Sequence, residues 1–347
     1  MSASYTTVGW NRVKKRYDAI MLAGIGVFLA LFIALGALLV PSLSFEILLI
    51  RALAVCAILM LHIVLAIGPL ARLSRFFMPA LYNRRHLGVA TFLVGLFHAA
   101  LATGWYHAGG DVNPIVSLLT ANTRVDSLRA FPFEWPGMGA LLILFLMAAT
   151  SHDFWLANLS PRVWKTLHML VYAAYFLLVA HVSLGVLQSE RSPLYPALLV
   201  LGALTLISLH LAAARKQRRI DRELDAKPKE GFVDVGAIDE MQIDRAVSIC
   251  VQGERIAVFR HGEQGEKISA VANRCAHQHG PLAEGKIVDG CITCPWHGYQ
   301  YVPETGCSPP PFTEKVTTYS VRIVAGRVLV NPNPNPPAPA SDVSATS

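Results

Sequence analysis

Charged residues are scarce in this chain. Asp, Glu, Lys and Arg make up 15% of the 347 residues, whereas hydrophobic residues make up 53%. A soluble globular domain has about 25% charged residues, so this composition excludes one soluble enzyme as the whole molecule. The net charge of +7 comes mainly from Lys and Arg that flank apolar runs. Attraction to anionic lipid explains that charge, and we expect no nucleic-acid partner.

The chain also lacks a glycine-rich turn between a strand and a helix, which is the motif that binds dinucleotide phosphates. The glycines of Gly24-Ile25-Gly26 lie inside an apolar run. Cysteine is sparse as well, with six in the chain. We expect Cys56, Cys250, Cys291 and Cys307 to be buried thiols, because a reducing compartment gives no reason to pair them.

Six uncharged apolar runs fill the chain before residue 215, each near the ~20 residues that a helix needs to cross a bilayer. The runs cover residues 19–40, 52–71, 87–110, 135–151, 166–189 and 192–214. Six buried core helices of this length in succession are not expected in a soluble domain. The sequence therefore predicts a six-helix transmembrane bundle over residues 18–214.

Lys and Arg alternate between the connections of this bundle. They are frequent before the first run, in the second and fourth connections and after the sixth run, and rare in the other three connections. Cytoplasmic loops carry such an excess. We therefore expect a multi-pass protein of the inner (plasma) membrane with both termini in the cytoplasm, after a cytoplasmic lead-in of residues 1–17.

Histidines at two of the expected spans, the third and the fifth, could serve as ligands. His98 lies near the middle of the third, and His168 and His181 lie near the two ends of the fifth. Imidazoles on facing helices are ligands for haem iron. At ~1.5 Å per residue, His168 and His181 are roughly 20 Å apart, which suits two stacked haems. Thirteen residues also turn a straight helix about 140° away from the same face, so a bend is required.

The C-terminal part has a different pattern. Residues 231–331 contain short apolar runs broken by glycine turns, which predicts a small all-β domain of antiparallel sheets. A charged linker, residues 215–230, precedes it. Residues 332–347 are rich in proline, alanine and serine and are expected to be a disordered tail.

Two short loops of this β domain carry Cys275-Ala276-His277 and, after sixteen intervening residues, Cys294-Pro295-Trp296-His297. Two thiolates and two imidazoles are the ligands of a Rieske 2Fe-2S cluster, in which one iron takes both cysteines and the other takes both histidines. A structural zinc site is the alternative, but zinc tolerates many ligand spacings.

Flanking residues resemble the Rieske family. They are Gly280-Pro281-Leu282, His297-Gly298-Tyr299, Thr305-Gly306 and Pro309-Pro310-Pro311. Rieske proteins of respiratory cytochrome bc complexes have an additional cysteine pair where Gly280 and Trp296 stand here. The resemblance is closer to soluble Rieske ferredoxins and oxygenase Rieske domains. Tyr299 replaces a serine that bonds a cluster sulfide, which implies a reduction potential in the lower part of the Rieske range. His279 is expected to be a solvated loop residue.

The membrane part resembles the ferric reductase-like transmembrane domain. The matching stretches are Arg84-Arg85-His86-Leu87-Gly88 leading to His98, then Thr150-Ser151-His152-Asp153-Phe154-Trp155, Trp164-Lys165-Thr166-Leu167-His168, Tyr172 and Ala180-His181. The resemblance implies haem b, one or two per chain. His98 and His181 would hold an outer haem, and His168 an inner haem together with the residue fourteen positions before His98.

That residue is Arg84. Oxidases and ferric reductases have histidine at this position, whereas the haem subunit that serves a periplasmic methionine sulfoxide reductase has arginine. An inner haem is then ligated by His168 with Arg84 or His62, is five-coordinate, or is absent. Arg84 alternatively pairs with haem propionates or lipid phosphate. We expect His62 to be a packed polar residue, and His107, His152 and His210 to be solvated at span ends.

These features together predict a membrane electron-transfer protein. Its electrons would come from a cytoplasmic donor, such as a flavoprotein reductase, because the chain has no nucleotide motif of its own. They would leave to an extracytoplasmic acceptor, a protein or a small molecule. Metal reduction, oxygen reduction and supply to a periplasmic reductase all fit, and the arginine favours the last. The Rieske component of a membrane-bound oxygenase is an alternative, although no span shows a 2-His-1-carboxylate iron site. A redox sensor is another.

Overall fold

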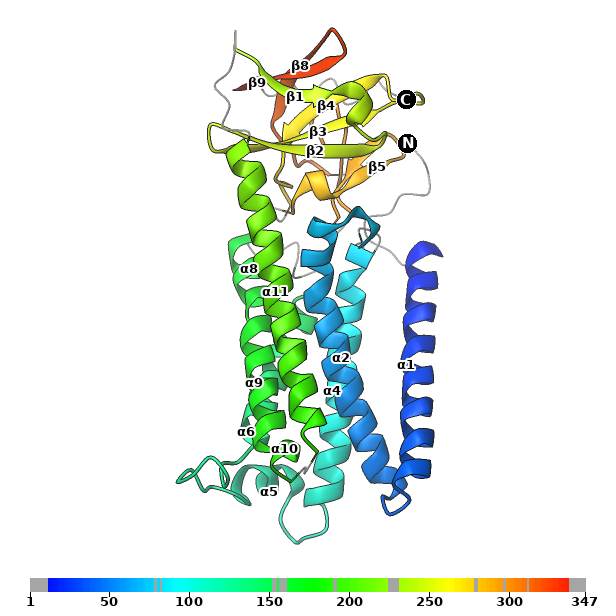
Figure 1. Ribbon diagram of the computed structural model, residues 1–347, viewed down its shortest axis with the longest axis vertical. Helices are drawn as coiled ribbons and strands as arrows, with labels where there is room; N and C mark the ends of the chain where they lie inside the picture. The colour runs from blue at the N-terminus through cyan, green and yellow to red at the C-terminus, as the bar shows by residue number, and fades with distance from the viewer. Residues whose placement is uncertain are drawn as a thin grey trace. The chain divides into compact units, whose positions relative to one another are not determined.

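A computed structural model describes residues 12–77, 80–81, 83–151, 155, 161–189, 192–223, 231–277, 280–295, 298–310 and 312–336. The chain divides into two compact units (Figure 1). The helical unit consists of Trp10–Gly68 and Asn83–His210. The β unit consists of Pro69–Tyr82 and Leu211–Ser347.

The helical unit is built from long apolar helices. They are α1 (Arg12–Leu39), α2 (Phe45–Leu73), α4 (Arg84–His107), α5 (Pro114–Thr120), α6 (Glu134–Ala149), α8 (Pro161–Met169), α9 (Val171–Leu184), α10 (Val186–Ser189) and α11 (Leu194–Glu223). Among the described residues, five stretches are long and apolar enough to cross a membrane. They lie at Lys14–Leu39, Phe45–Leu73, Arg84–His107, Thr166–Gln188 and Leu194–Arg219.

The fourth expected span is shorter than the ~20 residues that cross a bilayer as a helix. It corresponds to α6, which has 16 residues and is therefore about 24 Å long. At its C-terminal end the hydroxyls of Thr150 and Ser151 donate hydrogen bonds to the carbonyls of Leu146 and Met147, both at 2.7 Å. The amide of Thr150 also donates to the carbonyl of Leu146, at 3.0 Å, so the hydroxyl of Thr150 bonds beside the last helical backbone bond and does not replace it. The prediction of six full-length spans is thus not confirmed.

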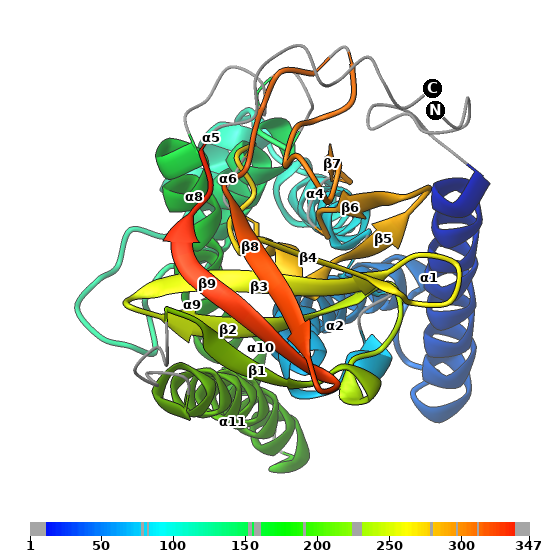
Figure 2. The same ribbon diagram turned by 90° about the horizontal axis from the view of Figure 1, so that it is seen from above.

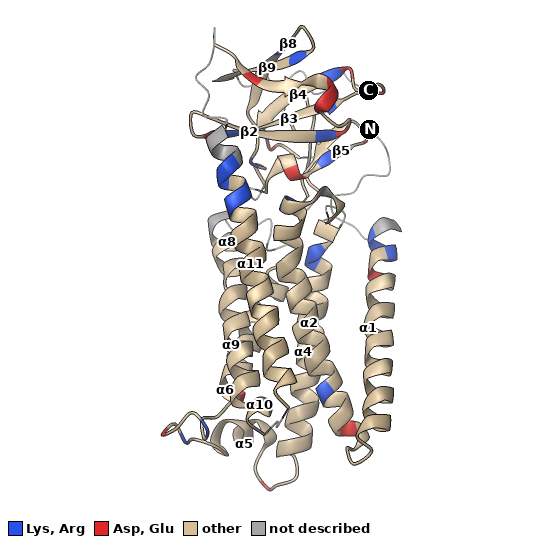
Figure 3. Ribbon diagram, in the orientation of Figure 1, with Lys and Arg blue, Asp and Glu red and all other residues tan. Residues whose placement is uncertain are grey.

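Apolar side chains from four helices form the core of this unit. Leu61 and Leu65 of α2 pack with Ala140 and Leu144 of α6, Val171 and Ala174 of α9, and Leu206 of α11. The faces that remain exposed are also apolar, for example Leu31 of α1 and Leu201 of α11 at 58% and 61% exposure. Lys and Arg gather at the ends of α1, α4 and α11 (Figure 3). Arg51 is an exception to this distribution. It lies in the second turn of α2, between the first two expected runs, and was not counted among the charges of the connections. Apolar outer faces are those of a protein in lipid.

The fifth expected span is interrupted. Helix α8 ends at Met169 and α9 begins at Val171, so Leu170 separates the helix of His168 from that of His181. A second interruption at Gly185 precedes α10. The interruption at Leu170 is slight, because its backbone keeps helical angles, with φ of −61° and ψ of −12°.

The β unit contains two antiparallel sheets (Figure 2). The six-stranded sheet has the order β1 (Val233–Ala237), β9 (Arg327–Pro334), β8 (Thr318–Val324), β4 (Lys267–Ala272), β3 (Glu254–His261) and β2 (Arg245–Val251). The three-stranded sheet has the order β5 (Lys286–Val288), β6 (Cys291–Thr293) and β7 (Gln300–Tyr301). Residues from both sheets, including Phe259 of β3 and Ile292 of β6, share one buried cluster. The expected all-β domain is therefore present.

Two elements continue past the domain limits that the sequence predicted. Helix α11 continues to Glu223, into the expected linker, and residues 224–230 lie outside the described residues. Strand β9 continues to Pro334, into the expected tail, because Pro334 pairs with Tyr319 and the amide of Asn335 donates to the carbonyl of Thr318 at 2.9 Å. Residues 1–11 of the lead-in and 337–347 of the tail lie outside the described residues.

Candidate functional site

Two loops at the three-stranded sheet carry the expected cluster ligands. The first follows β4, and its backbone is closed by a hydrogen bond from the amide of Cys275 to the carbonyl of Gly280 at 2.9 Å. The second connects β6 to β7 and is closed from the amide of Cys294 to the carbonyl of Tyr299 at 2.8 Å. Gly298, with φ of +71°, supplies the left-handed backbone that this tight loop requires. Each loop therefore holds its cysteine by the main chain.

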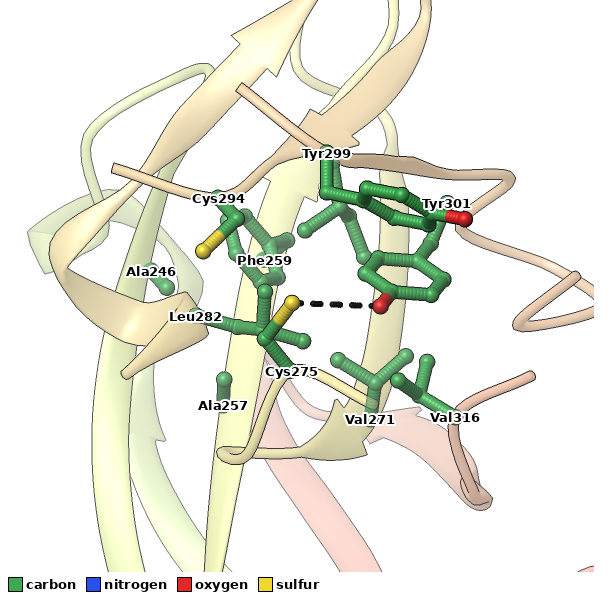
Figure 4. Close-up of a cluster of buried hydrophobic side chains, with 11 residues drawn as sticks. Ala246, Ala257, Phe259, Val271, Cys275, Leu282, Cys294, Tyr299, Tyr301 and Val316 are labelled. Carbon is green, nitrogen blue, oxygen red and sulfur yellow. Dashed lines mark hydrogen bonds between the residues drawn. The ribbon is translucent and has the colours of Figure 1, made fainter. Parts of the chain in front are cut away.

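Cys275 and Cys294 both belong to the buried cluster that the two sheets share, and each is 1% exposed. The hydroxyl of Tyr301 lies 3.1 Å from Sγ of Cys275 (Figure 4). The same oxygen accepts a hydrogen bond from the amide of His277 at 3.3 Å. Burial and the neighbouring Cys275 raise the pKa of Tyr301 above its ordinary value, so this residue stays a hydroxyl donor.

Asn273 anchors the first loop from its base. Its side-chain oxygen accepts from the amide of Ala283 at 2.7 Å, and its side-chain nitrogen donates to Oγ of Ser248 at 3.0 Å. Sequence analysis did not single out Asn273. An asparagine directly before a ligand loop is a local signal for such a role, because its amide can bond backbone on both sides of a turn.

His277 stacks on Tyr299, with ring centres 4.7 Å apart and an angle of 10° between the rings. Tyr299 is 5% exposed, and its hydroxyl donates to the carboxylate of Glu314. Burial, and then Glu314, raise the pKa of Tyr299. The fourth expected ligand, His297, lies outside the described residues, as do Trp296 and His279.

The donor set suits an iron–sulfur cluster. Buried thiols are favourable iron ligands once deprotonated, and the Tyr301 hydroxyl is placed to bond one ligand sulfur. Within the described ranges no group of three His, Cys, Asp or Glu side chains stands ready to hold a metal ion. The full set needs His297, which those ranges do not include.

The helical unit brings two of its expected ligands together. His98 of α4 and His181 of α9 have ring centres 6.5 Å apart and planes 73° apart. Nδ1 of His98 lies 3.1 Å from the carbonyl oxygen of Ile50, and Nδ1 of His181 lies 2.8 Å from that of Phe133. Each Nδ1–H therefore donates to a carbonyl of another segment, which fixes the tautomer that leaves Nε2 for a metal.

The separation of these rings fits a shared metal ion. A metal–nitrogen bond is roughly 2 Å long and the ring centre lies roughly 1 Å further on, so two axial imidazoles have centres roughly 6 Å apart. Gly137 of α6 makes room for this arrangement, because a Cβ there would lie 2.7 Å from Nδ1 of His181. Its role depends on a contact between helices, which sequence reasoning missed.

His168 has different surroundings. Trp164 stacks on its imidazole with ring centres 3.8 Å apart. Nδ1 lies 3.0 Å from the carbonyl of Trp164, and Nε2 lies 3.3 Å from Oγ of Ser151. Arg84 reaches α2, where its guanidinium lies 3.1 Å from the place a Cβ on Gly68 would occupy. Both ring nitrogens of His168 thus have polar neighbours within the protein.

The remaining histidines are held by polar partners. His62 lies between the carbonyl of Ile58 at 2.7 Å and the hydroxyl of Tyr175 at 3.1 Å, as expected for a packed polar residue. His210 bonds Tyr172 in the same way, at 3.0 Å. His107 lies 3.0 Å from Oγ of Ser117, and His152 lies outside the described residues.

Comparison with known families agrees with both halves of the chain. Residues 231–320 match the Rieske 2Fe-2S domain. Residues 51–179 match the ferric reductase like transmembrane component. Both resemblances noted in the sequence are therefore confirmed.

Individual relatives match one half each. The ferredoxin subunit of anthranilate 1,2-dioxygenase from Burkholderia cepacia is 40% identical over 98 residues, which are 28% of this chain and 88% of that protein. The protein-methionine-sulfoxide reductase heme-binding subunit MsrQ from Bordetella pertussis is 36% identical over 122 residues, which are 35% of this chain and 53% of that protein. A solved complex of oxygenase and ferredoxin in carbazole 1,9a-dioxygenase aligns with 31% of this chain and 99% of the matched chain, at 25% identity and a TM-score of 0.29.

Proposed function

We propose that this chain, which belongs to the Rieske 2Fe-2S family through residues 231–320 and to the ferric reductase-like transmembrane family through residues 51–179, passes electrons across the cell membrane from a cytoplasmic donor to an extracytoplasmic acceptor. One observation carries the proposal. A single chain combines the buried Cys275 and Cys294 of a Rieske domain with the paired imidazoles of His98 and His181 among membrane helices.

In this proposal Cys275 and Cys294 bind one iron of the cluster, and His277 and His297 bind the other. The bound cluster takes up and releases one electron at a time. The protein contributes a dry site, because both cysteines are 1% exposed, and a hydroxyl bond from Tyr301 to Cys275 that favours the reduced state.

His98 and His181 are the proposed axial ligands of one haem b. Their Nδ1 atoms bond carbonyls of other segments and their rings stand 6.5 Å apart. We do not extend the proposal to an inner haem. His168 is stacked by Trp164 and bonded to Ser151, and Arg84 stands where a second histidine would be needed.

The direction of transfer rests on charge. Lys and Arg gather at the ends of the helices that we assign to the cytoplasm, and this pattern supports a cytoplasmic β unit. A membrane potential negative inside then assists outward electron movement by ~2.3 kcal/mol per 100 mV. The 36% identity to MsrQ and the shared arginine support a periplasmic reductase as the acceptor.

Spectroscopy of the full chain, purified in detergent, tests the proposal. We expect the EPR signal of a cluster with mixed sulfur and nitrogen ligands, one haem b per chain, and two further irons. After stopped-flow mixing with a reductant that reaches only the cluster, the haem absorbance should follow cluster reduction. A cluster that never reduces the haem would contradict electron transfer and favour a redox sensor.

A further inference from the structure

Tyr299 is held by three neighbours, the expected ligand His277 and two residues outside the ligand set, Phe312 and Glu314. One face stacks on the imidazole of His277 at 4.7 Å and 10°. Its ring also packs against Phe312, with ring centres 5.0 Å apart. Its hydroxyl donates to the carboxylate of Glu314. A ring fixed at its face, its side and its tip has little freedom to move away from His277.

The loop that carries Glu314 is itself closed by hydrogen bonds. The carbonyl of Glu314 accepts from the amide of Ser308 at 2.9 Å, and the amide of Phe312 donates to the carbonyl of Pro309 at 3.1 Å. The carboxylate of Glu314 accepts a second bond, from the amide of Thr313, at 3.2 Å. The carboxylate therefore has a set position at the end of the Tyr299 side chain.

The charge of Glu314 acts on the same site as the stack. Reduction would add one negative charge to a cluster held by His277 and the other expected ligands. A carboxylate held beyond the stacked phenol repels the added charge. Tyr299, which separates the two, is buried and Glu314 is half-buried, so water screens this repulsion less than it would on the open surface.

We propose that Tyr299 and Glu314 form a positioning pair for the cluster, in which Glu314 holds the Tyr299 ring against the ligand His277 and its carboxylate lowers the reduction potential of the adjoining iron. The pair rests on the ligand set of the proposed function. The loop after the second ligand pair, which carries Glu314, would thus help to set the reduction potential of the cluster.

Redox titration of the full chain, followed by EPR, tests this pair. Glu314→Gln keeps a hydrogen-bond acceptor for Tyr299 but removes the charge. We expect it to shift the oxidised-to-reduced ratio at fixed potential toward the reduced state by roughly threefold to tenfold, which is about 28 to 59 mV for one electron. Tyr299→Phe keeps the stacked ring but releases the carboxylate, and should shift the ratio in the same direction.

The double variant separates a coupled pair from two independent effects. If the two residues act through their shared bond, the shift in Tyr299→Phe with Glu314→Gln is smaller than the sum of the single shifts. Glu263→Gln is the matched control, because Glu263 is an exposed acid in the turn between β3 and β4. It removes the same charge and should leave the ratio unchanged.

Three results would overturn the inference. An unchanged potential in Glu314→Gln, with a full cluster signal, would reduce the pair to a packing contact. Additive shifts would remove the coupling. A wild-type protein with no mixed-ligand EPR signal would overturn the ligand set of the proposed function, and the pair with it, and this outcome is distinct from a signal that the variants fail to move.

Discussion

His98 and His181 come from different helices, and their imidazoles face a common space with ring centres 6.5 Å apart. Each Nδ1 is bonded to a backbone carbonyl of a neighbouring segment. The helical unit therefore presents two imidazoles of fixed tautomer, at a spacing that would suit the two axial ligands of a six-coordinate iron.

Replacing either member of this pair is expected to remove the haem. His98→Ala and His181→Ala should each lose more than about nine-tenths of the haem absorbance. Loss of a residue that only orients a metal ligand already costs about tenfold or more in metal affinity, and loss of an axial ligand should cost at least as much. His168→Ala is the comparison, and should keep the haem. Haem content per chain, measured by the pyridine haemochrome spectrum, decides the matter, and halving of the haem in His168→Ala would instead establish a second haem.

Gly137→Ala is predicted to disturb the same site without touching a ligand. The new Cβ would lie 2.7 Å from Nδ1 of His181, which is too close for two atoms that are not bonded to each other. The imidazole cannot easily move away, because Nδ1 is hydrogen-bonded to the carbonyl of Phe133. Alanine by itself stabilises a helix by about 0.5–1 kcal/mol relative to glycine, so any loss must come from the clash. Gly139→Ala, on the same helix, meets only a methyl of Leu177 at 3.3 Å. We expect a broadened or diminished haem Soret band in the first variant and an unchanged band in the second.

Tyr301→Phe is predicted to lower the potential of the cluster. The hydroxyl lies 3.1 Å from Sγ of Cys275, and a hydrogen bond to a ligand sulfur favours the reduced state. A net bond of about 0.5–1.5 kcal/mol corresponds to roughly 20–60 mV for one electron. Tyr319→Phe removes a hydroxyl in the other buried cluster of the β unit and serves as the control. A potential that moves equally in both variants would contradict the assignment.

The stability of the β unit is predicted to fall in acid through His261. This histidine is 5% exposed and lies 2.9 Å from Oγ of Ser269. Burial lowers its pKa below the ordinary 6.5. Nearby charges modify this value, Lys267 lowering the pKa and Glu304, Asp244 and Glu266 raising it. The folded state therefore prefers the neutral ring. Its contribution is present above pH ~6.5 and is lost as the pH falls through the folded-state pKa.

Thermal unfolding of the full chain, followed by loss of cluster absorbance between pH 7.5 and 5, measures this effect. Wild type should melt at lower temperature as the pH falls. In His261→Gln, which keeps a hydrogen-bonding side chain but cannot titrate, the dependence should be weaker. Equal slopes in the two proteins would show that His261 does not contribute.

The sequence predicted the type of structure in both halves of the chain, because each type depends on a pattern among neighbouring residues. The apolar runs indicated membrane helices, and Cys275, His277 and Cys294 occur in a motif that the β loops bring together at the three-stranded sheet. Contacts between distant segments were not predictable in this way. The stack of His277 on Tyr299, the carbonyls that orient His98 and His181, and the space provided by Gly137 all depend on tertiary packing.

Two of the expected spans differ in detail from the structure. The fourth apolar run was assigned a span on hydropathy, and the corresponding helix α6 has 16 residues, so the sixth full-length span is not confirmed. The fifth was treated as one helix, although the need for a bend between His168 and His181 was apparent from the 3.6-residue period. The structure places a break at Leu170.

The order of the six-stranded sheet also bears on how the protein is made. Strand β9 lies between β1 and β8, so the first strand after the membrane helices has its sheet partner only near residue 330. Synthesis runs from the N-terminus and domains fold as units. The helices thus leave the ribosome well before the sheet can close, and assembly of the iron–sulfur centre becomes a late event on a chain that already resides in the bilayer.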